Sequence, residues 1–516
     1  MFPLLSGVTG VIGKDRICGV VAATDARSMW GQLRQALHSS RTAELRLDWL
    51  VDDYQIQRFL GQLSGTKIAT RLGATLIATC RRRGAGGRYR GSIAKQLLHL
   101  AEALRAGCSW YDLEIESIRE CLPELLDVLL GEGRMLASAH FFDRLPRNLN
   151  LVDKELNRSG ANAIKVAAQC DSLAQGLKVL RLARGRRNVV AIPMGDAVLP
   201  LRLLALREGS AISYAPVENA TAQGQVLLPE VKSRYRADRL NRRTRVYGIV
   251  GNPVAQSLSP LMQNAAFQAR RMNAVYLPFL VGDLRDFLRA IKPIGIAGFS
   301  VTIPHKQAIL SHLDGCDPLA AAIGAVNTVV VRGGGRLYGY NTDYIGVLRA
   351  LEPRIPLRAS RVLIVGAGGA ARAAAFALTR AGAAVCVCSR RPKTAAALAK
   401  AVSGYAIPHS RLRNEFFDAI VNATPVGMHP RTQDSPLDRS HLNCRLIFDT
   451  IYRPRETRLL QMAAARGIET VSGFEMFVAQ GTAQFEIWTG KRAPADVMRK
   501  AAMSALQREE RVQNRE

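Results

Sequence analysis

The sequence predicts an α/β protein in which a (β/α)8 barrel is followed by a two-lobed α/β module. Short apolar runs alternate with amphipathic segments throughout residues 15–230, which is typical of parallel strands covered by helices. The alternation continues after residue 240, where a Gly-rich turn, GAGGA (366–370), lies between an apolar run and an Ala-rich run. The length of 516 residues is enough for three or four domains at roughly 100 to 200 residues each.

The first half contains eight short runs with the composition of buried strands. They are residues 17–23, 42–48, 74–80, 109–115, 134–140, 162–168, 188–194 and 211–216. Eight strands separated by helical segments predict a (β/α)8, or TIM, barrel. Active sites of such barrels lie at the carboxyl ends of the strands, so charged residues within or just after these runs are the candidates.

The charge distribution excludes some classes of partner. The net charge is +29, but the basic residues are spread along the chain and form no basic block with interleaved aromatic residues. We therefore expect no nucleic-acid partner, and a positive field suits anionic substrates and a nucleotide cofactor. No apolar run reaches the roughly 18 residues of a membrane span, so we expect no membrane partner.

The cysteines and the amino terminus predict a cytoplasmic protein. The nine cysteines have no C-x-x-C spacing, which favours reduced thiols and no metal site. Cys386 and Cys388 are close together, and we expect them on opposite faces of a strand. The first residues contain no basic region ahead of a long apolar core, so they do not resemble a signal peptide.

Lys165 lies in the middle of the apolar run NAIKVAA. Burial and cationic neighbours would disfavour its charged form and leave an amine that can attack a ketone. His140, at the end of the preceding run, can act as general base and then as general acid. The imine would serve as an electron sink for loss of an α-proton and a β-hydroxyl, without metal or cofactor. Asp112 and Glu114 are either catalytic or form ion pairs inside the barrel, and the sequence leaves both open.

This half resembles type I 3-dehydroquinate dehydratases in the blocks ELRLD, TCR, YDLE, SAH and IKVA. The resemblance implies that Lys165 forms the imine and His140 moves the proton. The further substrate contacts that it implies are Glu44, Arg46 and Arg81 for the ring hydroxyls, and Arg202, Thr221 and Gln225 for the carboxylate. Members of this family usually have an acid before the Gly pair that follows TCR, where this chain has Ala85. We expect that difference to alter the rate more than the reaction type.

The second half is organised around GFSVTIPHK (298–306), GAVNTVV (324–330) and GYNTD (339–343). Lys306 ends the first block and Asp343 closes the third, which predicts a proton-transfer pair for a small polyol. These blocks resemble shikimate dehydrogenases, and so does SLSP (257–260). The alternative interpretation of its two serines is a helix N-cap. The resemblance implies that Lys306 and Asp343 are catalytic. The substrate contacts that it implies are Ser257, Ser259, Thr302, Asn327, Tyr452 and Gln480.

The Gly-rich turn has the context of a Rossmann dinucleotide fingerprint, because it follows an apolar strand and begins a helix. The next predicted strand ends in Ser389, Arg390 and Arg391 with no acid for a ribose hydroxyl, which favours the 2′-phosphate of NADP. By resemblance, Thr424 and Met476 flank the nicotinamide. The expected cofactor contacts are Gly366, Ala367, Gly368, Gly369, Ala370, Ser389, Arg390, Arg391, Thr424 and Met476.

We interpret the chain as a fusion of two consecutive steps, similar to bifunctional 3-dehydroquinate dehydratase–shikimate dehydrogenases. The expected domains are a barrel at 1–240, a substrate lobe at 241–350 completed by 475–510, and a Rossmann lobe at 351–474. The first would convert 3-dehydroquinate to 3-dehydroshikimate, and the second would reduce that product to shikimate with NADPH, towards aromatic amino acids. The sequence does not indicate an oligomeric state.

Two alternative functions stay open at this point. One is a catabolic quinate dehydrogenase, which activity on quinate with NAD would reveal. The other is a non-catalytic regulator descended from these enzymes. Such a protein is expected to lose Lys165, His140 or Lys306, and all three are present.

The paired guanidiniums predict a cofactor preference. We expect the protein to prefer NADP to NAD, and Arg390→Ala to weaken NADP binding about ten- to hundredfold by removing a charge-assisted contact. Michaelis constants for both cofactors check this. An equal loss for NAD and NADP would exclude a contact with the 2′-phosphate.

Overall fold

The computed structural model describes the chain except residues 1–11, 122–130, 132, 219–224 and 514–516. It divides into two compact units. One contains the described residues up to Thr244 together with Arg285–Pro293, and the other contains Arg245–Leu284 and the described residues from Ile294 onward. No helix in the described ranges is both long enough and apolar enough to cross a membrane.

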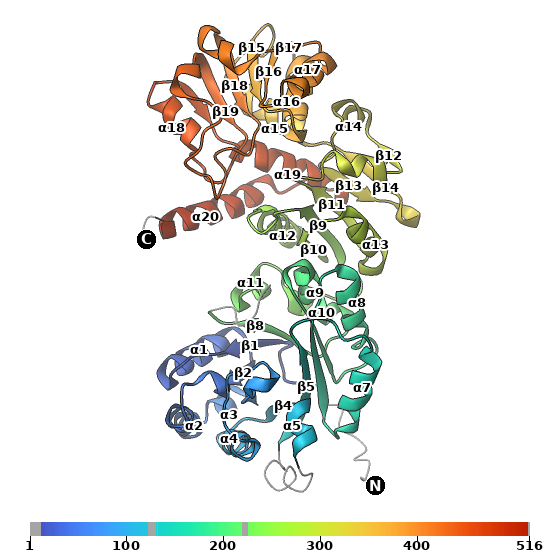
Figure 1. The fold of residues 1–516 in the computed structure, drawn as a ribbon, viewed down its shortest axis with the longest axis vertical. Coiled ribbons are helices and arrows are strands. Elements are labelled where there is room, and N and C mark those ends of the chain that lie inside the picture. Colours follow the sequence, from blue (N-terminus) through green and yellow to red (C-terminus); the bar gives the residue numbers. More distant parts are fainter. Residues whose placement is uncertain (1–11, 122–130, 132, 219–224, 514–516) are drawn as a thin grey trace. The chain divides into compact units, whose positions relative to one another are not determined.

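The first unit is built on eight parallel strands, in the order β7-β6-β5-β4-β3-β2-β1-β8 (Figure 1). The strands are β1 (Ile17–Val21), β2 (Thr42–Arg46), β3 (Thr75–Thr79), β4 (Trp110–Glu114), β5 (Arg134–Phe141), β6 (Ala163–Gln169), β7 (Val189–Met194) and β8 (Ser213–Pro216). The N–H of Ala211, just before β8, donates to the carbonyl of Val189 at 2.8 Å, which brings the two edges together. The predicted (β/α)8 barrel is confirmed.

Helices follow the strands in the order that a (β/α)8 barrel requires. They are α1 (Ala26–Ser39), α2 (Asp53–Thr66), α3 (Ile68–Leu72), α4 (Ile93–Arg105), α5 (Ile115–Glu120), α7 (Leu149–Arg158), α8 (Leu173–Arg181), α9 (Leu199–Leu203), α10 (Ala205–Glu208) and α11 (Leu228–Ser233). Local sequence sets several starts, because Asp25 and Asp52 each accept a backbone N–H in the first turn of α1 and α2.

The barrel interior changes from apolar to polar along the strands. An apolar layer near the amino ends contains Cys18, Ile77, Leu136 and Val190, which come from the odd-numbered strands. Further along, the buried Glu44, Asp112 and Lys165 and the half-buried Tyr214, whose hydroxyl is buried, come from the even-numbered strands β2, β4, β6 and β8. Side chains from alternate strands form layers in (β/α)8 barrels, so the polar groups lie on an apolar floor.

The second unit begins with a mixed sheet in the order β10-β9-β11-β13-β14-β12. Its strands are β9 (Arg245–Gly251), β10 (Ala274–Leu280), β11 (Ile296–Val301), β12 (Gly315–Cys316), β13 (Thr328–Val331) and β14 (Leu337–Tyr340). The helices of this stretch are α12 (Ser259–Ala269), α13 (Leu284–Ile294) and α14 (Pro318–Ile323). β13 is antiparallel to both β11 and β14, whereas β9 and β11 are parallel to each other.

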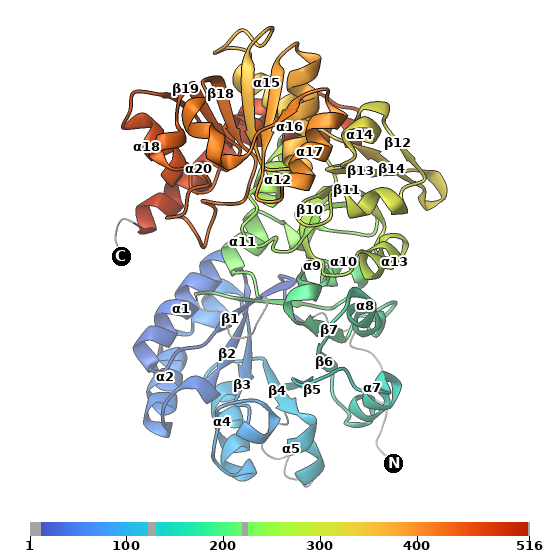
Figure 2. The ribbon, with the colours of Figure 1, turned by 45° about the horizontal axis from the view of Figure 1, so that its top comes forward.

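A second, fully parallel sheet has the order β17-β16-β15-β18-β19-β20 and carries helices on both faces (Figure 2). It contains β15 (Arg361–Val365), β16 (Ala384–Cys388), β17 (Tyr405–Ala406), β18 (Phe417–Asn422), β19 (Cys444–Asp449) and β20 (Glu469–Val471). The helices are α15 (Asp343–Leu351), α16 (Gly369–Arg380), α17 (Pro392–Ala401) and α18 (Arg458–Ala464). This is a Rossmann-type lobe, as predicted.

The two cysteines of β16 correct one expectation. Cys386 and Cys388 pack in the same apolar cluster, whereas Val385 and Val387 pack in the cluster on the other face. Side chains two residues apart in a strand point to the same face, so the expected opposite orientation was wrong.

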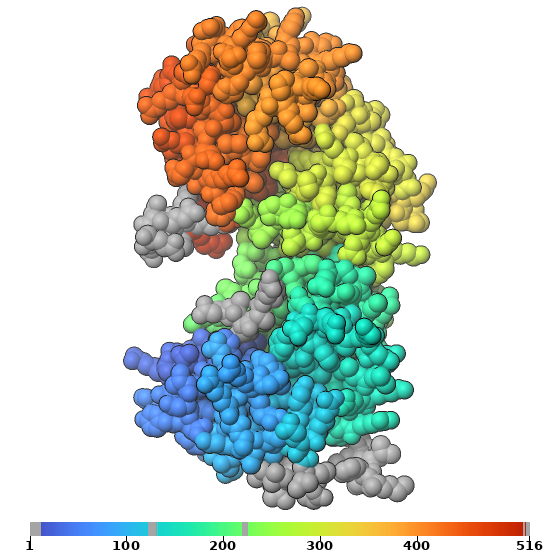
Figure 3. Space-filling model, in the orientation of Figure 1, coloured from blue at the N-terminus to red at the C-terminus, as the bar shows by residue number. Residues whose placement is uncertain are grey.

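The last two helices, α19 (Phe474–Thr489) and α20 (Ala495–Gln513), pack on the mixed sheet. Phe485, Trp488 and Met498 join Tyr247 and Tyr276 in one apolar cluster. α19 also packs on α15, and the two lobes of the second unit form adjoining surfaces (yellow and orange, Figure 3).

Candidate active sites

Lys165 is the centre of the polar layer in the barrel. The residue is 2% exposed, and its Nζ forms an ion pair with Asp112 and lies 3.3 Å from Glu44 Oε1. The ring of Tyr214 lies 4.7 Å from the same nitrogen. The expected cationic neighbours are therefore wrong: the charges nearest to Lys165 are carboxylates. These carboxylates offset the free-energy cost of burying the positive charge of Lys165 inside the barrel.

Asp112 belongs to this ion-pair network. It accepts from Ser138 Oγ at 2.6 Å and lies 3.4 Å from Arg81 Nη2. Burial acts to raise the pKa of Asp112, but the positive charges of Lys165 and Arg81 outweigh it and hold that pKa below its usual range. Of the two roles left open by the sequence, the structure shows ion pairing for Asp112.

Glu114 has a different set of partners. Its carboxylate accepts from Gln96 Nε2 and Ser117 Oγ, both at 2.9 Å, and from the N–H of Arg82 at 3.2 Å. These bonds tie the end of β4 to α4, α5 and the loop after β3. Glu114 therefore supports the loop beside the site.

His140 lies near the carboxyl end of β5, and its ring stacks on Phe142 at 5.9 Å and 15°. A methyl group on Gly86 would lie 2.0 Å from the Phe142 ring, so this ring fills the space above the loop after β3. Burial, followed by the charges of Arg81 and Lys165, lowers the pKa of His140 well below its usual value. Its Nδ1 is buried and has no hydrogen-bond partner within the described ranges. The imidazole is therefore neutral near pH 7, the form that a general base requires.

Arg202 on α9 is a buried guanidinium that is available to an anion. It is 9% exposed, and its Nη1 has no hydrogen-bond partner among the residues that the structure describes. Burial lowers the pKa of Arg202 to about 10. A buried guanidinium nitrogen without a partner costs free energy. Such a group is typical of a site that binds a carboxylate. Gln225 is within the described chain, whereas Thr221 lies outside the described residues.

The predicted contacts to ring hydroxyls are brought together at the same end of the barrel. Glu44 accepts from Thr79 Oγ1 at 3.0 Å as well as from Lys165. Arg46 donates from Nε and Nη2 to Asp48 at 2.9 and 2.8 Å, so two of its three nitrogens are already engaged. The buried Nε of Arg81 has no partner in the described part of the chain.

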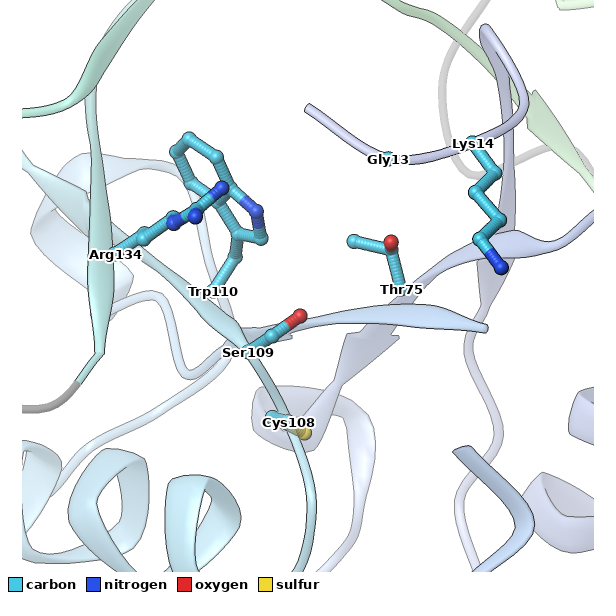
Figure 4. Close-up of a pocket in the computed structure, with 7 residues that line it drawn as sticks. All are labelled: Gly13, Lys14, Thr75, Cys108, Ser109, Trp110 and Arg134. Carbon is cyan, nitrogen blue, oxygen red and sulfur yellow. The ribbon is translucent and has the colours of Figure 1, made fainter. Parts of the chain in front are cut away.

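A cavity of about 580 Å³ lies at the opposite end of the strands. Thr75, Trp110 and Arg134, at the amino ends of β3, β4 and β5, line it (Figure 4). It is separated from Lys165 by the apolar layer, so it does not belong to the catalytic end.

The second site is built on Lys306 and Asp343. Lys306 Nζ donates to Asp343 Oδ2 at 2.6 Å, and Asn327 Nδ2 donates to Asp343 Oδ1 at 2.8 Å. The Asn327 amide is itself oriented, because its Oδ1 accepts from the N–H of Thr342 at 2.8 Å. Both oxygens of the carboxylate are therefore held, and the amine has a defined direction, as a proton-transfer pair requires.

A chain of buried polar groups lies behind this pair. Tyr276 donates to Ser300 at 2.6 Å, Ser300 donates to Gln484 at 2.8 Å, and Gln484 donates to the carbonyl of Asn327 at 3.1 Å. Sequence reasoning missed Tyr276, Ser300 and Gln484. The available signal was a polar group at an interior position of an apolar strand or helix.

The remaining substrate candidates lie on other elements of this unit: at the start of α12, just after β11, just after β19 and on α19. Leu258 occupies the N-cap position of α12 and makes no side-chain cap, and Ser257 Oγ accepts from the N–H of Ser259 at 3.2 Å. The ring of Tyr452 stacks on Phe477 at 4.3 Å. Gln480 donates to the carbonyl of Phe477 at 2.9 Å. Thr302, just after β11, lies against Gly251, where a methyl group would be 2.3 Å from Thr302 Cγ2.

The Gly-rich turn fits a dinucleotide. Gly366 has φ +119°, and a methyl group there would lie 2.9 Å from the carbonyl oxygen of Ala423. Gly369, the first residue of α16, lies against Lys306, since a methyl group there would be 3.1 Å from Lys306 Cβ. The start of α16, with its N–H groups, is therefore beside the proton-transfer pair, where a pyrophosphate can bind.

The carboxyl end of β16 supplies positive charge for the same ligand. Arg390 and Arg391 are both exposed. Ser389 Oγ donates to the carbonyl of Arg391 at 2.8 Å and so closes the turn that carries them. This arrangement fits a 2′-phosphate. Thr424 lies beside Gly366, and Met476 lies against Gly346 of α15.

These features define an α/β enzyme with two sites, one at a buried lysine in a barrel and one between a polyol-binding lobe and a dinucleotide-binding lobe. Family models match in the same order. The type I 3-dehydroquinase model covers residues 17–242, the shikimate dehydrogenase substrate binding domain 249–329, and the shikimate 5′-dehydrogenase C-terminal domain 473–503. A model of an FAD binding domain matches residues 361–433, the segment that dinucleotide-binding folds share.

The chain is similar to characterised proteins over most of its length. It is 33% identical to the chloroplastic bifunctional 3-dehydroquinate dehydratase/shikimate dehydrogenase of Arabidopsis thaliana, over 88% of this chain and 78% of that protein. It is 43% identical to a shikimate dehydrogenase (NADP(+)) of Symbiobacterium thermophilum, over 51% of this chain and 95% of that protein. A solved shikimate 5-dehydrogenase of Thermus thermophilus, in complex with NADP(H) and shikimate, is 38% identical over 51% of this chain and 100% of that chain, with a TM-score of 0.47. The chain belongs to the family of bifunctional 3-dehydroquinate dehydratase/shikimate dehydrogenases.

The loop after β3 generates a prediction about His140. Ala85 lines a cavity of about 530 Å³, so a longer side chain has room. It directly precedes Gly86, which lies against the Phe142 ring that stacks on His140. Ala85→Glu should place a carboxylate near His140 and raise its pKa, which stabilises the imidazolium by a fraction to about 3 kcal/mol. The acid limb of the dehydratase pH–rate profile should move to higher pH, or the rate should rise.

The matched control for this variant is Ala85→Gln, which fills the same space without a charge. It should leave the acid limb where the unaltered protein has it. Equal shifts in both variants would mean that volume, and not charge, governs His140.

Proposed function

We propose that the chain catalyses two consecutive reactions, dehydration of 3-dehydroquinate and reduction of 3-dehydroshikimate to shikimate with NADPH. The observation that carries the proposal is that each unit contains a complete reactive pair. Lys165 and His140 lie in the barrel, and Lys306 and Asp343 lie in the second unit. The membership of the family supports both activities.

In the dehydratase, Lys165 attacks the ketone of 3-dehydroquinate, and loss of water gives an imine. His140 removes a proton from the adjacent carbon, and the electron pair passes into the imine. The protonated His140 then donates its proton to the departing hydroxyl, which leaves as water. Hydrolysis of the imine releases 3-dehydroshikimate and restores the amine. Arg202, with Thr221 and Gln225, holds the carboxylate, and Glu44, Arg46 and Arg81 hold the ring hydroxyls.

Covalent trapping tests this assignment. Borohydride added with 3-dehydroquinate should reduce the imine, inactivate the dehydratase and leave the adduct on Lys165. Peptide mass mapping checks the position, and an adduct on another lysine would overturn it. EDTA should have no effect, because the amine itself provides the electron sink.

In the reductase, Lys306 gives a proton to the developing alkoxide of 3-dehydroshikimate, and Asp343 orients Lys306. Ser257 and Ser259 hold the carboxylate, while Thr302, Asn327, Tyr452 and Gln480 contact the ring. When bound, NADPH supplies the hydride. Its pyrophosphate would lie on residues 366–370, its 2′-phosphate beside Ser389, Arg390 and Arg391, and its nicotinamide near Thr424 and Met476.

We assign the domains to residues 1–240, 241–350 with 475–510, and 351–474. The partners are the small-molecule substrates of the two reactions, without nucleic acid or membrane. A cytoplasmic location is supported by the nine cysteines, all of which are unbridged in this fold. In the relative from Arabidopsis thaliana the location is the chloroplast.

The two reactive pairs predict independent inactivation. Lys165→Ala should abolish dehydration and leave reduction intact, and Lys306→Ala or Asp343→Asn should do the reverse, because each change removes a group from one pair only. Steady-state assays of each half-reaction in each variant check this.

An equimolar mixture of Lys165→Ala and Lys306→Ala proteins extends the test. It should convert 3-dehydroquinate to shikimate through free solution at the flux of the unaltered protein with equal site concentrations. One lysine change that silences both reactions, or a mixture that stops at 3-dehydroshikimate, would contradict two independent sites.

A further inference from the structure

We propose that Asp449 is a positioning residue of the reductase, whose buried carboxylate holds the Thr424 turn and the segment leading to Tyr452 in register with each other. The inference rests on the proposed function of this site. It concerns the carboxyl edge of the Rossmann sheet, where Asn422 ends β18 and Asp449 ends β19. The two residues are direct partners in the parallel ladder, and both are 0% exposed.

Three donors converge on the Asp449 carboxylate. Its Oδ1 accepts from Asn422 Nδ2 and from the N–H of Ile451, both at 3.0 Å, and its Oδ2 accepts from Thr457 Oγ1 at 2.7 Å. An ionised carboxylate is an acceptor only, so it matches a set of three donors. A protonated acid would have to turn its O–H towards Thr457 Oγ1, the one partner of the three that can also accept.

The bond to Asn422 sets the direction of that side chain. Because Asn422 Nδ2 faces Asp449, its Oδ1 is turned the other way and accepts from both the N–H and the hydroxyl of Thr424, at 3.0 and 2.7 Å. Thr424 in turn lies against Gly366 of the Gly-rich turn. Asp449 therefore controls the position of Thr424 at the cofactor side through one intervening amide.

The bond to Ile451 positions the substrate side. The carbonyl of Ile451 accepts from the N–H of Gly473 at 3.0 Å, immediately before α19. The next residue, Tyr452, stacks on Phe477. One buried carboxylate thus anchors both segments that the proposed reaction brings together, and its side chain is 0% exposed.

The charge of Asp449 is maintained without a cation. Its contacts are the Asn422 amide, the Ile451 N–H and the Thr457 hydroxyl, and no charged side chain in the described ranges contacts it. Burial raises the pKa of Asp449 to about 6, against the hydrogen bonds, which act to lower it. The folded state therefore binds this proton more readily than the unfolded state, and stability is lost as pH rises through about 6. Asn in its place would avoid that loss, so the ionised group destabilises the fold at neutral pH. Such groups are typical of functional sites.

Asp449→Asn tests the proposal, since Asn keeps one acceptor oxygen and removes the charge. Its matched control is Asp418→Asn at the other end of β18, where Asp418 accepts from the N–H of Arg361. We expect the rate constant for 3-dehydroshikimate reduction to fall about fivefold in Asp449→Asn at pH 8, as charge-assisted hydrogen bonds become neutral ones. The ratio of unaltered to variant rate should decline as pH falls through about 6 and approach unity towards pH 4.

Two further readouts separate positioning from a passive structural role. The melting temperature of Asp449→Asn should exceed that of the unaltered protein at pH 8 by a few degrees, and the difference should vanish towards pH 4. Dehydratase activity should be unchanged, and Asp418→Asn should show a rate ratio of unity at every pH. If Asp449 acts on the rate chiefly through the Asn422 amide, the double variant Asp449→Asn with Asn422→Ala should reduce 3-dehydroshikimate no more slowly than Asn422→Ala alone.

A rate ratio that is independent of pH, or a variant that is less stable and equally active, would overturn the proposal. Failure of the proposed function is a separate outcome, recognised when the unaltered protein does not reduce 3-dehydroshikimate. In that case the NADP affinities of the unaltered protein and Asp449→Asn, measured by calorimetry at pH 8 and pH 5, decide the role of Asp449. Affinities that differ at pH 8 and converge at pH 5 support it, and equal affinities at both values refute it.

Discussion

Parallel strands bring their carboxyl ends to one edge of a sheet, and both sites of this protein depend on that constraint. In the barrel it places Glu44 and Asp112, from two different strands, in contact with Lys165 of a third. In the Rossmann lobe the same rule brings Gly366, Asn422 and Asp449 to one edge. The helices between the strands form the outer shell and do not cover the edges where the two sites lie.

The two halves stabilise buried polar groups in different ways. The barrel uses charge against charge, because Lys165 is surrounded by carboxylates and Asp112 by cations. The substrate lobe uses a directed chain of neutral hydrogen bonds from Tyr276 to Asn327, and this chain leads to the ion pair of Lys306 with Asp343. A Schiff-base site needs a buried amine, whereas a reductase site needs an oriented proton donor, and each environment suits its reaction.

The sequence predicted the architecture well because apolar periodicity is local. The eight barrel strands, the Gly-rich turn and the pairing of Lys306 with Asp343 followed from runs and blocks of a few residues. The partners of Lys165 did not, because its contact with Glu44 depends on the register of strands 121 residues apart. The same limit hid Gln484, which reaches Asn327 from α19, and Asn422, whose amide direction depends on the opposite strand. The error at Cys386 and Cys388 was one of strand periodicity and could have been avoided.

The alternating layer in the barrel has a consequence for how such chains diverge. Glu44, Asp112 and the ring of Tyr214 surround the Lys165 amine, so replacing one of the four residues removes part of the environment that stabilises buried charge. Selection should remove single replacements at these four residues. Related proteins that have lost the dehydratase reaction should lack several of the four residues together. A related barrel that has exchanged the lysine but kept both acids would be a poorly folding intermediate. Correlated change at these four positions is therefore a sign that a related barrel no longer catalyses the reaction.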